Sequence, residues 1–188
     1  MAEELKVNYE LGVAGWLVEQ LGREGQQLSE PVAGDIHLRE PDAVCESPSG
    51  RVGIEVAAAY YNDEEARNVW AMARGTPERS SRYLAPGVNL RDFARRLPVL
   101  VNFTAHLVKG LRRTLDDHCR KTYCVPSHLV MDVTHAALTT TDEAPGILAE
   151  LQVPVDCPFI AVYVAFSENW SKKVLLFELA RPPLEPEC

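Results

Sequence analysis

Two acidic residues, Asp42 and Glu55, stand in short apolar runs on either side of a turn-forming stretch. Asp42 directly follows Pro41, and Glu55 lies between Ile54 and Val56. A carboxylate among apolar strand residues is costly to bury unless another group compensates its charge. Two such acids on adjacent strands are able to share a divalent cation, and Mg²⁺ prefers oxygen ligands. The alternative is that Glu55 faces solvent while its apolar neighbours turn inward.

The elements that must position these acids are short strands between Gly34 and Tyr61. The spacing predicts a β-hairpin in which Asp42–Glu46 and Arg51–Tyr60 are joined by a turn at Ser47–Gly50. The alternating residues Asp35–Arg39 predict a further strand before it. The hairpin therefore brings Asp42 and Glu55 to neighbouring strands.

Helices and strands alternate along the rest of the chain. Apolar residues at helical spacing predict a helix over Glu3–Leu21 and a main helical region over Leu90–Tyr123, with Pro98 in a first turn. Apolar runs and turn signals predict three more strands and a short helix: Ser127–Val133, Phe159–Phe166, Lys173–Leu179, and the helix Pro145–Leu151. This order predicts a mixed α/β or α+β fold, a central mixed sheet flanked by helices.

Length and composition limit the classes of protein that are possible. A chain of 188 residues and 20.9 kDa fits one domain, which we expect over 1–180, followed by an extended tail over 181–188. The net charge of −8 excludes a histone-like protein that coats DNA by bulk charge. No apolar run reaches the roughly 20 residues that span a bilayer, and Met1–Lys6 carries acids where a secretory signal carries basic residues. We expect a cytoplasmic protein without a membrane partner.

The charge is unevenly distributed. Between Ala66 and Lys121 there are twelve basic residues and four acidic ones, a local charge of +8 against −16 for the rest of the chain. Such a segment is able to hold a polyanion, because phosphates respond to the local field. Five arginines are the candidate nucleic-acid-binding residues: Arg91, Arg95, Arg96, Arg112 and Arg113. The alternative is a solvated loop and helix face. Residues 62–89, which overlap the start of this segment, predict a helix fragment and a long loop.

Five scattered cysteines without a CxxC pair do not indicate a disulfide framework, so we expect reduced thiols. A zinc site is the alternative at four residues: His118, Cys119, Cys124 and His128. Asp132 and His135, at a strand end, are able to belong to a site, although a strand-end Asp is commonly a cap or turn residue. The two C-terminal strands either complete the core or form an edge for a homodimer.

Pro41-Asp42, twelve intervening residues, and then Glu55-Val56-Ala57 after an apolar lead-in resemble the PD-(D/E)XK nuclease superfamily, which has the restriction-endonuclease-like fold. The order of elements is similar as well, over about Glu3–Val133. The resemblance implies that Asp42 and Glu55 bind Mg²⁺ or Mn²⁺, with the carbonyl of Val56. An acid of the first helix joins them in some members, and Glu10 is the best match here, with Glu3, Glu4 and Glu19 as alternatives.

The sequence departs from the family at one position, because Ala57 stands where the motif has lysine. That lysine activates water or stabilises the charged transition state. In some members the basic group comes from the following helix, which makes Lys109 the candidate catalytic lysine. His106 and Lys121 are weaker candidates, and the alternative is that Lys109 is a surface lysine.

The resemblance implies a Mg²⁺-dependent nuclease that hydrolyses phosphodiester bonds, acting on DNA rather than RNA. The metal lowers the pKa of a bound water and neutralises charge on the phosphate. A second hypothesis is a catalytically inactive relative that keeps the fold and binds nucleic acid or a protein partner. The third is an unrelated α/β binding or assembly protein. A P-loop, a dinucleotide fingerprint and a GxSxG motif are absent from the sequence.

Overall fold

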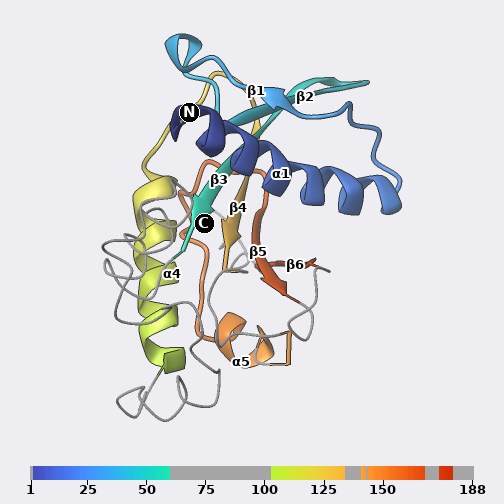
Figure 1. The fold of residues 1–188 in the computed structure, drawn as a ribbon. Coiled ribbons are helices and arrows are strands. Elements are labelled where there is room, and N and C mark those ends of the chain that lie inside the picture. The colour runs from blue at the N-terminus through green and yellow to red at the C-terminus, as the bar shows by residue number, and fades with distance from the viewer. Residues whose placement is uncertain (1, 60–102, 134–140, 143, 168–173, 180–188) are drawn as a thin grey trace, which may run out of the picture.

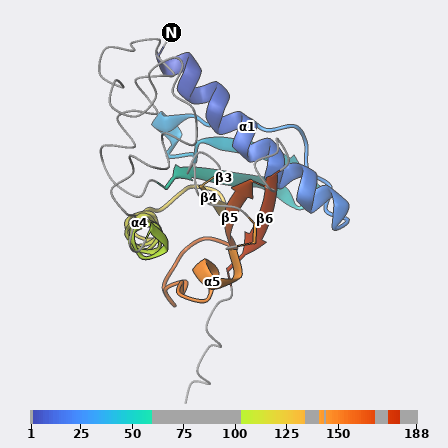
Figure 2. The same ribbon diagram turned by 60° about the horizontal axis from the view of Figure 1, so that its bottom comes forward.

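A six-stranded mixed sheet forms the centre of the protein, and helices cover both of its faces (Figures 1 and 2). The computed structural model describes residues 2–59, 103–133, 141–142, 144–167 and 174–179. The helices, including the 3₁₀-helix η1, are α1 (Ala2–Arg23), η1 (Ile36–Leu38), α4 (Phe103–Cys119) and α5 (Ala144–Leu148). The strands are β1 (Val32–Ala33), β2 (Ala43–Ser47), β3 (Gly50–Ala58), β4 (Ser127–Asp132), β5 (Val162–Ser167) and β6 (Val174–Glu178). The predicted fold class is confirmed.

The strands lie in the sheet in sequence order, β1 to β6. β1, β2 and β3 are antiparallel neighbours, and Ser47 pairs with Gly50 at the predicted hairpin turn. β3, β4 and β5 are parallel, and β6 returns antiparallel to β5. Each parallel step needs a crossover, and the described helices α4 and α5 lie within those two connections.

Two hydrophobic clusters lie on opposite faces of the sheet. On one face, Val13 and Leu17 of α1 belong to the same buried cluster as Ile54 of β3. On the other face, Leu111 of α4 and Ala57 of β3 belong to a second cluster, which also includes Ile147 of α5. Figure 2 shows α1 on one side of the sheet and both α4 and α5 on the other. Because side chains alternate along a strand, Glu55 is on the same side of β3 as Ala57, the α4 side.

Two glycines, Gly22 and Gly25, stand at the end of α1. The N–H of Gln26 donates to the Leu21 carbonyl at 2.9 Å, and the N–H of Gly25 donates to the Gly22 carbonyl at 3.1 Å. These two bonds form a Schellman motif, which places a residue with positive φ after the helix. Gly25 has a φ of 90°. The helix therefore ends where glycine makes the reversal accessible.

Gly25→Ala is expected to lower the free energy of unfolding by about 1 kcal/mol, because an L side chain is strained at that φ. Gly22→Ala, inside the helix, is expected to raise it by up to about 1 kcal/mol. A Cβ at either position meets no atom within 4 Å, so the two effects are conformational. Urea unfolding followed by tryptophan fluorescence measures both. Shifts of the two variants in the same direction would contradict this account.

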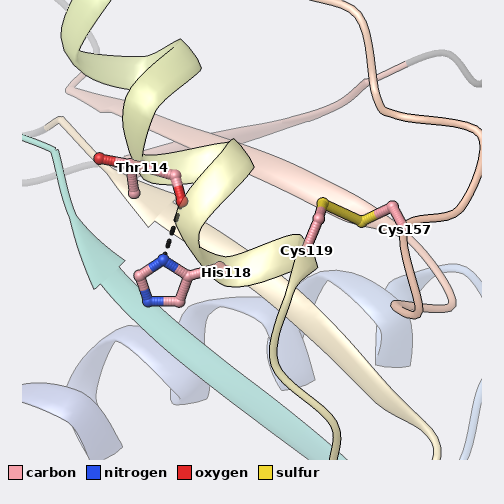
Figure 3. Close-up of a disulfide and its surroundings, with 4 residues drawn as sticks. All are labelled: Thr114, His118, Cys119 and Cys157. Carbon is pink, nitrogen blue, oxygen red and sulfur yellow. Dashed lines mark hydrogen bonds between the residues drawn. A yellow bond between two sulfur atoms is a disulfide. The ribbon is translucent and has the colours of Figure 1, made fainter.

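The cysteines differ from the prediction. Cys119 and Cys157 form a disulfide that joins the end of α4 to the segment before β5 (Figure 3). The expectation that all thiols are reduced is therefore wrong for these two, while Cys45 and Cys124 are free. The bridge spans 38 positions of sequence, and only the fold brings the two residues together. The zinc alternative is also wrong, because Cys119 is committed to the bridge.

The predicted strand Asp35–Arg39 is wrong as well, since Ile36–Leu38 form the 3₁₀-helix η1. Asp35 closes this turn by accepting a hydrogen bond from the N–H of His37 at 2.8 Å, and Arg39 has a positive φ of 54°. An aspartate that bonds to the backbone two residues on favours a turn over a strand.

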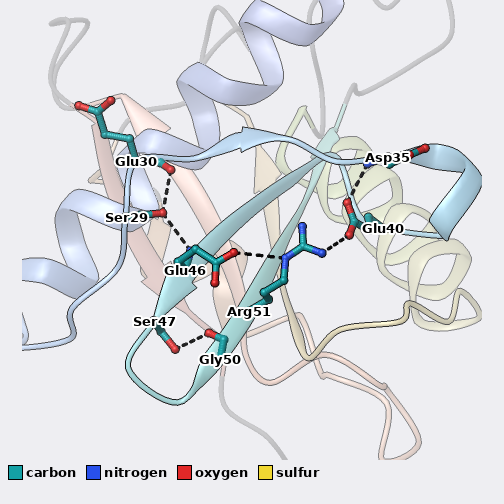
Figure 4. A network of polar contacts seen from close by, with 8 residues as sticks. All are labelled: Ser29, Glu30, Asp35, Glu40, Glu46, Ser47, Gly50 and Arg51. Carbon is teal, nitrogen blue, oxygen red and sulfur yellow. Dashed lines mark hydrogen bonds and ion pairs between the residues drawn. The ribbon is translucent and has the colours of Figure 1, made fainter.

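Glu40 fixes that turn to the hairpin (Figure 4). Its carboxylate accepts from the N–H of Asp35 at 2.9 Å and pairs with the guanidinium of Arg51 on β3. Arg51 also lies 3.4 Å from Glu46 of β2. This network fixes the backbone directly before Pro41 and Asp42 against the hairpin.

Other predictions are confirmed with small changes in their boundaries or lie outside the described residues. The first helix, the two hairpin strands, β4, α5, β5 and β6 are present, and α4 ends at Cys119 rather than continuing to Tyr123. The loop 62–89, the helix start at Pro98 and the tail 181–188 lie outside the described residues. Among the helices that are described, none has the length and apolar character needed to cross a membrane.

Candidate functional site

Asp42 and Glu55 meet at the open end of the hairpin. Ala43 of β2 pairs with Ile54 of β3, and the next residue beyond this pair on each strand is Asp42 or Glu55. The Oδ2 atom of Asp42 accepts a hydrogen bond of 2.9 Å from the N–H of Val56, the residue after Glu55. The structure therefore places the two acids side by side, as the hairpin predicts.

Burial decides between the two hypotheses for Glu55. Its side chain is 5% exposed, so the alternative that it faces solvent is wrong. Asp42 is half-buried beside it. Burial, followed by the negative charge of Glu55, raises the pKa of Asp42 to about 7, although the N–H of Val56 favours the ionised form. The pair is thus a concentration of negative charge with little access to water.

Lys121 compensates the charge of Glu55. Its ammonium group donates a hydrogen bond of 2.6 Å to Glu55 Oε1, from the segment that follows α4. Lys109, the lysine favoured from the sequence, is exposed on α4, and no hydrogen bond or ion pair joins it to another residue in the described ranges. His106 is also exposed. The structure thus brings Lys121 to the acidic pair and leaves Lys109 apart from it.

His118, which the sequence indicates only as a ligand of the alternative zinc site, is a second neighbour of Glu55. Its Nε2 atom lies 3.4 Å from Glu55 Oε1, and its Nδ1 donates to the Thr114 carbonyl at 2.8 Å (Figure 3). Burial, followed by the charge of Lys121, lowers the pKa of His118, which favours the neutral ring at pH 7. In that ring Nδ1 carries the proton, so Nε2 presents a lone pair next to Glu55.

Tyr123 completes this side of the site. Its hydroxyl oxygen is buried beside the carboxylate of Glu55. Burial, then the charge of Glu55 and a hydrogen bond to its carboxylate, raise the pKa of Tyr123, so the hydroxyl keeps its proton. Tyr123 is therefore a third group, with Lys121 and His118, that lies next to Glu55.

The first helix contributes Glu10 and Lys6. Glu10 is 8% exposed and pairs with Lys6 at 2.9 Å. The bond to Glu10 raises the pKa of Lys6, and the charges of Asp42 and Glu55 add to the effect, which places Lys6 within their field. Tyr9 donates to Asp132 Oδ2 at 2.6 Å and so anchors this helix to the end of β4. Of the alternative acids, Glu4 and Glu19 are exposed.

The candidate phosphate-binding arginines divide into three groups. Arg112 is held by Glu150, through bonds of 3.1 and 2.6 Å to its carbonyl and 3.1 Å to its carboxylate. Arg113 is exposed on α4. Arg91, Arg95 and Arg96 lie outside the described residues. Arg112 therefore links α4 to the turn after α5, and this structural role accounts for its position.

The donor set for a metal consists of two carboxylates. Within the described ranges, no three His, Cys, Asp or Glu side chains gather as ligands of one ion. Val56 and Lys121 each bond one oxygen of the pair, Asp42 Oδ2 and Glu55 Oε1. Mg²⁺ commonly uses one or two carboxylates together with water and substrate phosphate. The two acids fit such a site without a third ligand.

No family model matches the sequence, and no curated protein does. Among solved structures, the chain is similar to SfsA of Pyrococcus furiosus in complex with Ca²⁺, with 14% sequence identity and a TM-score of 0.31. The match covers 96% of this chain and 64% of that one, so the chain spans less than two thirds of its length. A likeness of this degree transfers no activity.

Proposed function

We propose that the protein is a Mg²⁺-dependent nuclease whose site is formed by Asp42, Glu55 and Lys121. The observation that carries the proposal is the ion pair of 2.6 Å between Lys121 and the buried Glu55, next to the half-buried Asp42. Two carboxylates and one lysine at the open end of a hairpin are the chemical groups that the PD-(D/E)XK resemblance requires. Lys121 would supply the positive charge of the motif lysine, whose place in this sequence is taken by Ala57.

Asp42 and Glu55 would hold the metal, with the carbonyl of Val56 as a further ligand that the resemblance implies. Glu10, which the resemblance also implies, is paired with Lys6 and does not gather with the two acids as a third carboxylate in the described structure. Bound Mg²⁺ supplies a nucleophilic water and neutralises charge on the phosphate. The raised pKa of Asp42 supports a cation there, because a divalent ion relieves the repulsion between the two acids. The pair thus has an electrostatic reason to bind a cation.

The basic groups around the acids act on the substrate. Lys121 keeps its ammonium beside Glu55 and is half-exposed, so it is able to contact a phosphate oxygen while it remains fixed. Its charge stabilises the negative charge that develops during phosphodiester hydrolysis. The protonated hydroxyl of Tyr123 lies beside Glu55 on the same side. Exposed Arg113 would contact the nucleic-acid backbone, which positions the substrate without reading its sequence.

Asp42→Asn and Glu55→Gln are expected to weaken the binding of Mn²⁺ and Mg²⁺ by at least about tenfold. Calorimetric titration at low salt measures this, alone and with a DNA duplex present, because substrate phosphate often completes a Mg²⁺ site. Glu46→Gln is the matched control, since Glu46 is an exposed acid of the same hairpin. Equal affinities for wild type and all three variants would refute a metal site at this hairpin.

Cleavage assays with DNA and RNA then separate the proposal from its alternative. The proposed nuclease cleaves DNA in the presence of Mg²⁺ and loses this activity in Asp42→Asn. A protein that binds nucleic acid in a salt-dependent manner without cleaving it is the catalytically inactive relative. The ion pair between Lys121 and Glu55 is the feature that favours the active enzyme.

A further inference from the structure

The segment that carries Lys121 is fastened at both ends to one other part of the chain. Cys119, two residues before Lys121, is bridged to Cys157 (Figure 3). Tyr123, two residues after it, packs on Phe159 with ring centroids 5.8 Å apart. Both partners belong to the short segment that precedes β5. Lys121 therefore lies between two fixed points of the chain, a disulfide two residues before it and an aromatic contact two residues after it.

Other bonds that would fix the segment are few. Apart from helical bonds, the backbone of 120–123 makes one hydrogen bond within the described ranges, from the N–H of Lys121 to the His118 carbonyl at 2.9 Å. The next bond to a distant segment is from the N–H of Cys124 to the Arg39 carbonyl at 3.3 Å. The Lys121 side chain is 45% exposed, so packing holds it only in part. The backbone on either side of Lys121 is thus held by the disulfide and the aromatic contact.

We propose that the Cys119–Cys157 disulfide positions Lys121 against Glu55, and that its reduction releases this ion pair. The bridge closes a loop of 38 positions, so opening it restores freedom to the end of α4. His118, which precedes Cys119, would move with Lys121. The inference goes beyond the proposed function and does not depend on nuclease activity, because it concerns the position of one side chain.

The redox step is a thiol–disulfide exchange with a dithiol reductant. One thiolate of the dithiol attacks a sulfur of the bridge and forms a mixed disulfide. Its second thiolate displaces the protein thiol, and the dithiol becomes a cyclic disulfide. Cys119 and Cys157 receive two electrons and two protons and end as thiols. In compartments that keep thiols reduced, bridges of this kind are typically transient or redox-sensing.

Competitive acetylation of lysines, read by mass spectrometry, tests the proposal with dithiothreitol as the probe. The chain has five lysines, and Lys109, exposed on α4 and without a partner in the described part, is the internal reference. An ion-paired ammonium reacts slowly, because it must first lose its partner. Reduction is expected to raise the reactivity of Lys121 relative to Lys109 by at least about twofold.

Three controls keep the test decisive. Glu55→Gln is expected to raise the same ratio in the oxidised protein and to make it insensitive to reduction. Cys157→Ser is expected to show the same ratio as the reduced wild type. Cys124→Ser, which removes a free thiol, is expected to show the same ratio as the oxidised wild type. The count of free thiols must rise by two on reduction. An unchanged ratio after that rise would overturn the proposal, as would a count that does not rise.

Discussion

Lys121→Met is expected to lower the rate of Mg²⁺-dependent phosphodiester cleavage by about 10²- to 10³-fold, the usual loss when one donor to a developing oxyanion is removed. The structure places this ammonium 2.6 Å from Glu55, where the charge of the substrate phosphate would develop. Metal affinity is expected to stay the same or to rise, since Glu55 loses a competing cation. Single-turnover cleavage at saturating Mg²⁺ measures the chemical step without the contribution of binding.

Lys109→Met is the matched control for this prediction. Lys109 is exposed on α4, the helix directly before the segment that carries Lys121, and it has no partner in the described ranges. It is expected to cleave at the wild-type rate. Lys121→Arg, which keeps a charge, is expected to lie between Lys121→Met and wild type. Full activity in Lys121→Met together with a large loss in Lys109→Met would refute the role of Lys121 and restore the lysine favoured from the sequence.

The hairpin and its acids were predictable because local signals agree there. Apolar alternation, the Ser47–Gly50 turn and the carboxylates all indicate two paired strands, and a register fixed by the turn makes Asp42 and Glu55 neighbours. The burial of Glu55 was not predictable from alternation alone. β3 is covered on both faces, by α1 and by α4, so no side of it is an outer one.

The choice of lysine was not predictable for a geometric reason. A lysine on a helix reaches only what its face of the helix approaches, and the face of α4 at Lys109 points to solvent. Lys121 approaches Glu55 because α4 ends at Cys119 and the chain then turns back toward the hairpin. The sequence carries one signal of this, the basic pair Arg120-Lys121 at the helix end. The turn itself depends on the contacts of Cys119 and Tyr123 with the segment before β5.

The disulfide and the 3₁₀-helix could not be predicted from the sequence, for two different physical reasons. Cys119 and Cys157 are separated by 38 positions, and no local pattern pairs residues at that distance. The run Asp35–Arg39 alternates as a strand does, yet the bonds of Asp35 and Glu40 to nearby backbone N–H groups stabilise a turn. Side-chain bonds to the backbone compete with strand pairing at such positions, and here they prevail.

Asp42→Asn is expected to stabilise the protein above pH 7 and to have little effect at pH 4 in the absence of divalent ions. The pKa of Asp42 is raised from 3.8 to about 7 by burial and by Glu55, so between these pH values the folded chain keeps a proton that the unfolded chain has lost. The free energy of unfolding therefore falls as pH rises through this window. One pKa unit is worth about 1.4 kcal/mol, so the gain in Asp42→Asn at pH 8 is about 2–4 kcal/mol.

The difference between variant and wild type must be followed, because another group acts in the opposite direction. Burial lowers the pKa of His128 to about 4, so the unfolded chain gains a proton there below pH 6.5, and wild-type stability falls as pH falls. That contribution is common to both proteins and cancels in the difference. Urea unfolding with a chelator, from pH 4 to pH 9, measures the difference. Asp116→Asn, at an exposed acid of α4, is expected to change stability by less than about 0.5 kcal/mol throughout.

Glu55→Gln then separates burial from the charge of Glu55, the two causes that raise the pKa of Asp42. With the charge of Glu55 removed and the burial of Asp42 retained, the pH-dependent gain of Asp42→Asn is expected to shrink without vanishing, since burial is the larger cause. Addition of Mg²⁺ to the wild type at pH 8 is expected to recover part of the same stability, because a bound cation relieves the repulsion that the mutation removes. A gain that is equal at pH 4 and pH 8 would show that the pKa of Asp42 is the same in the folded and the unfolded chain. The electrostatic reason for a cation at the hairpin would then fall with it.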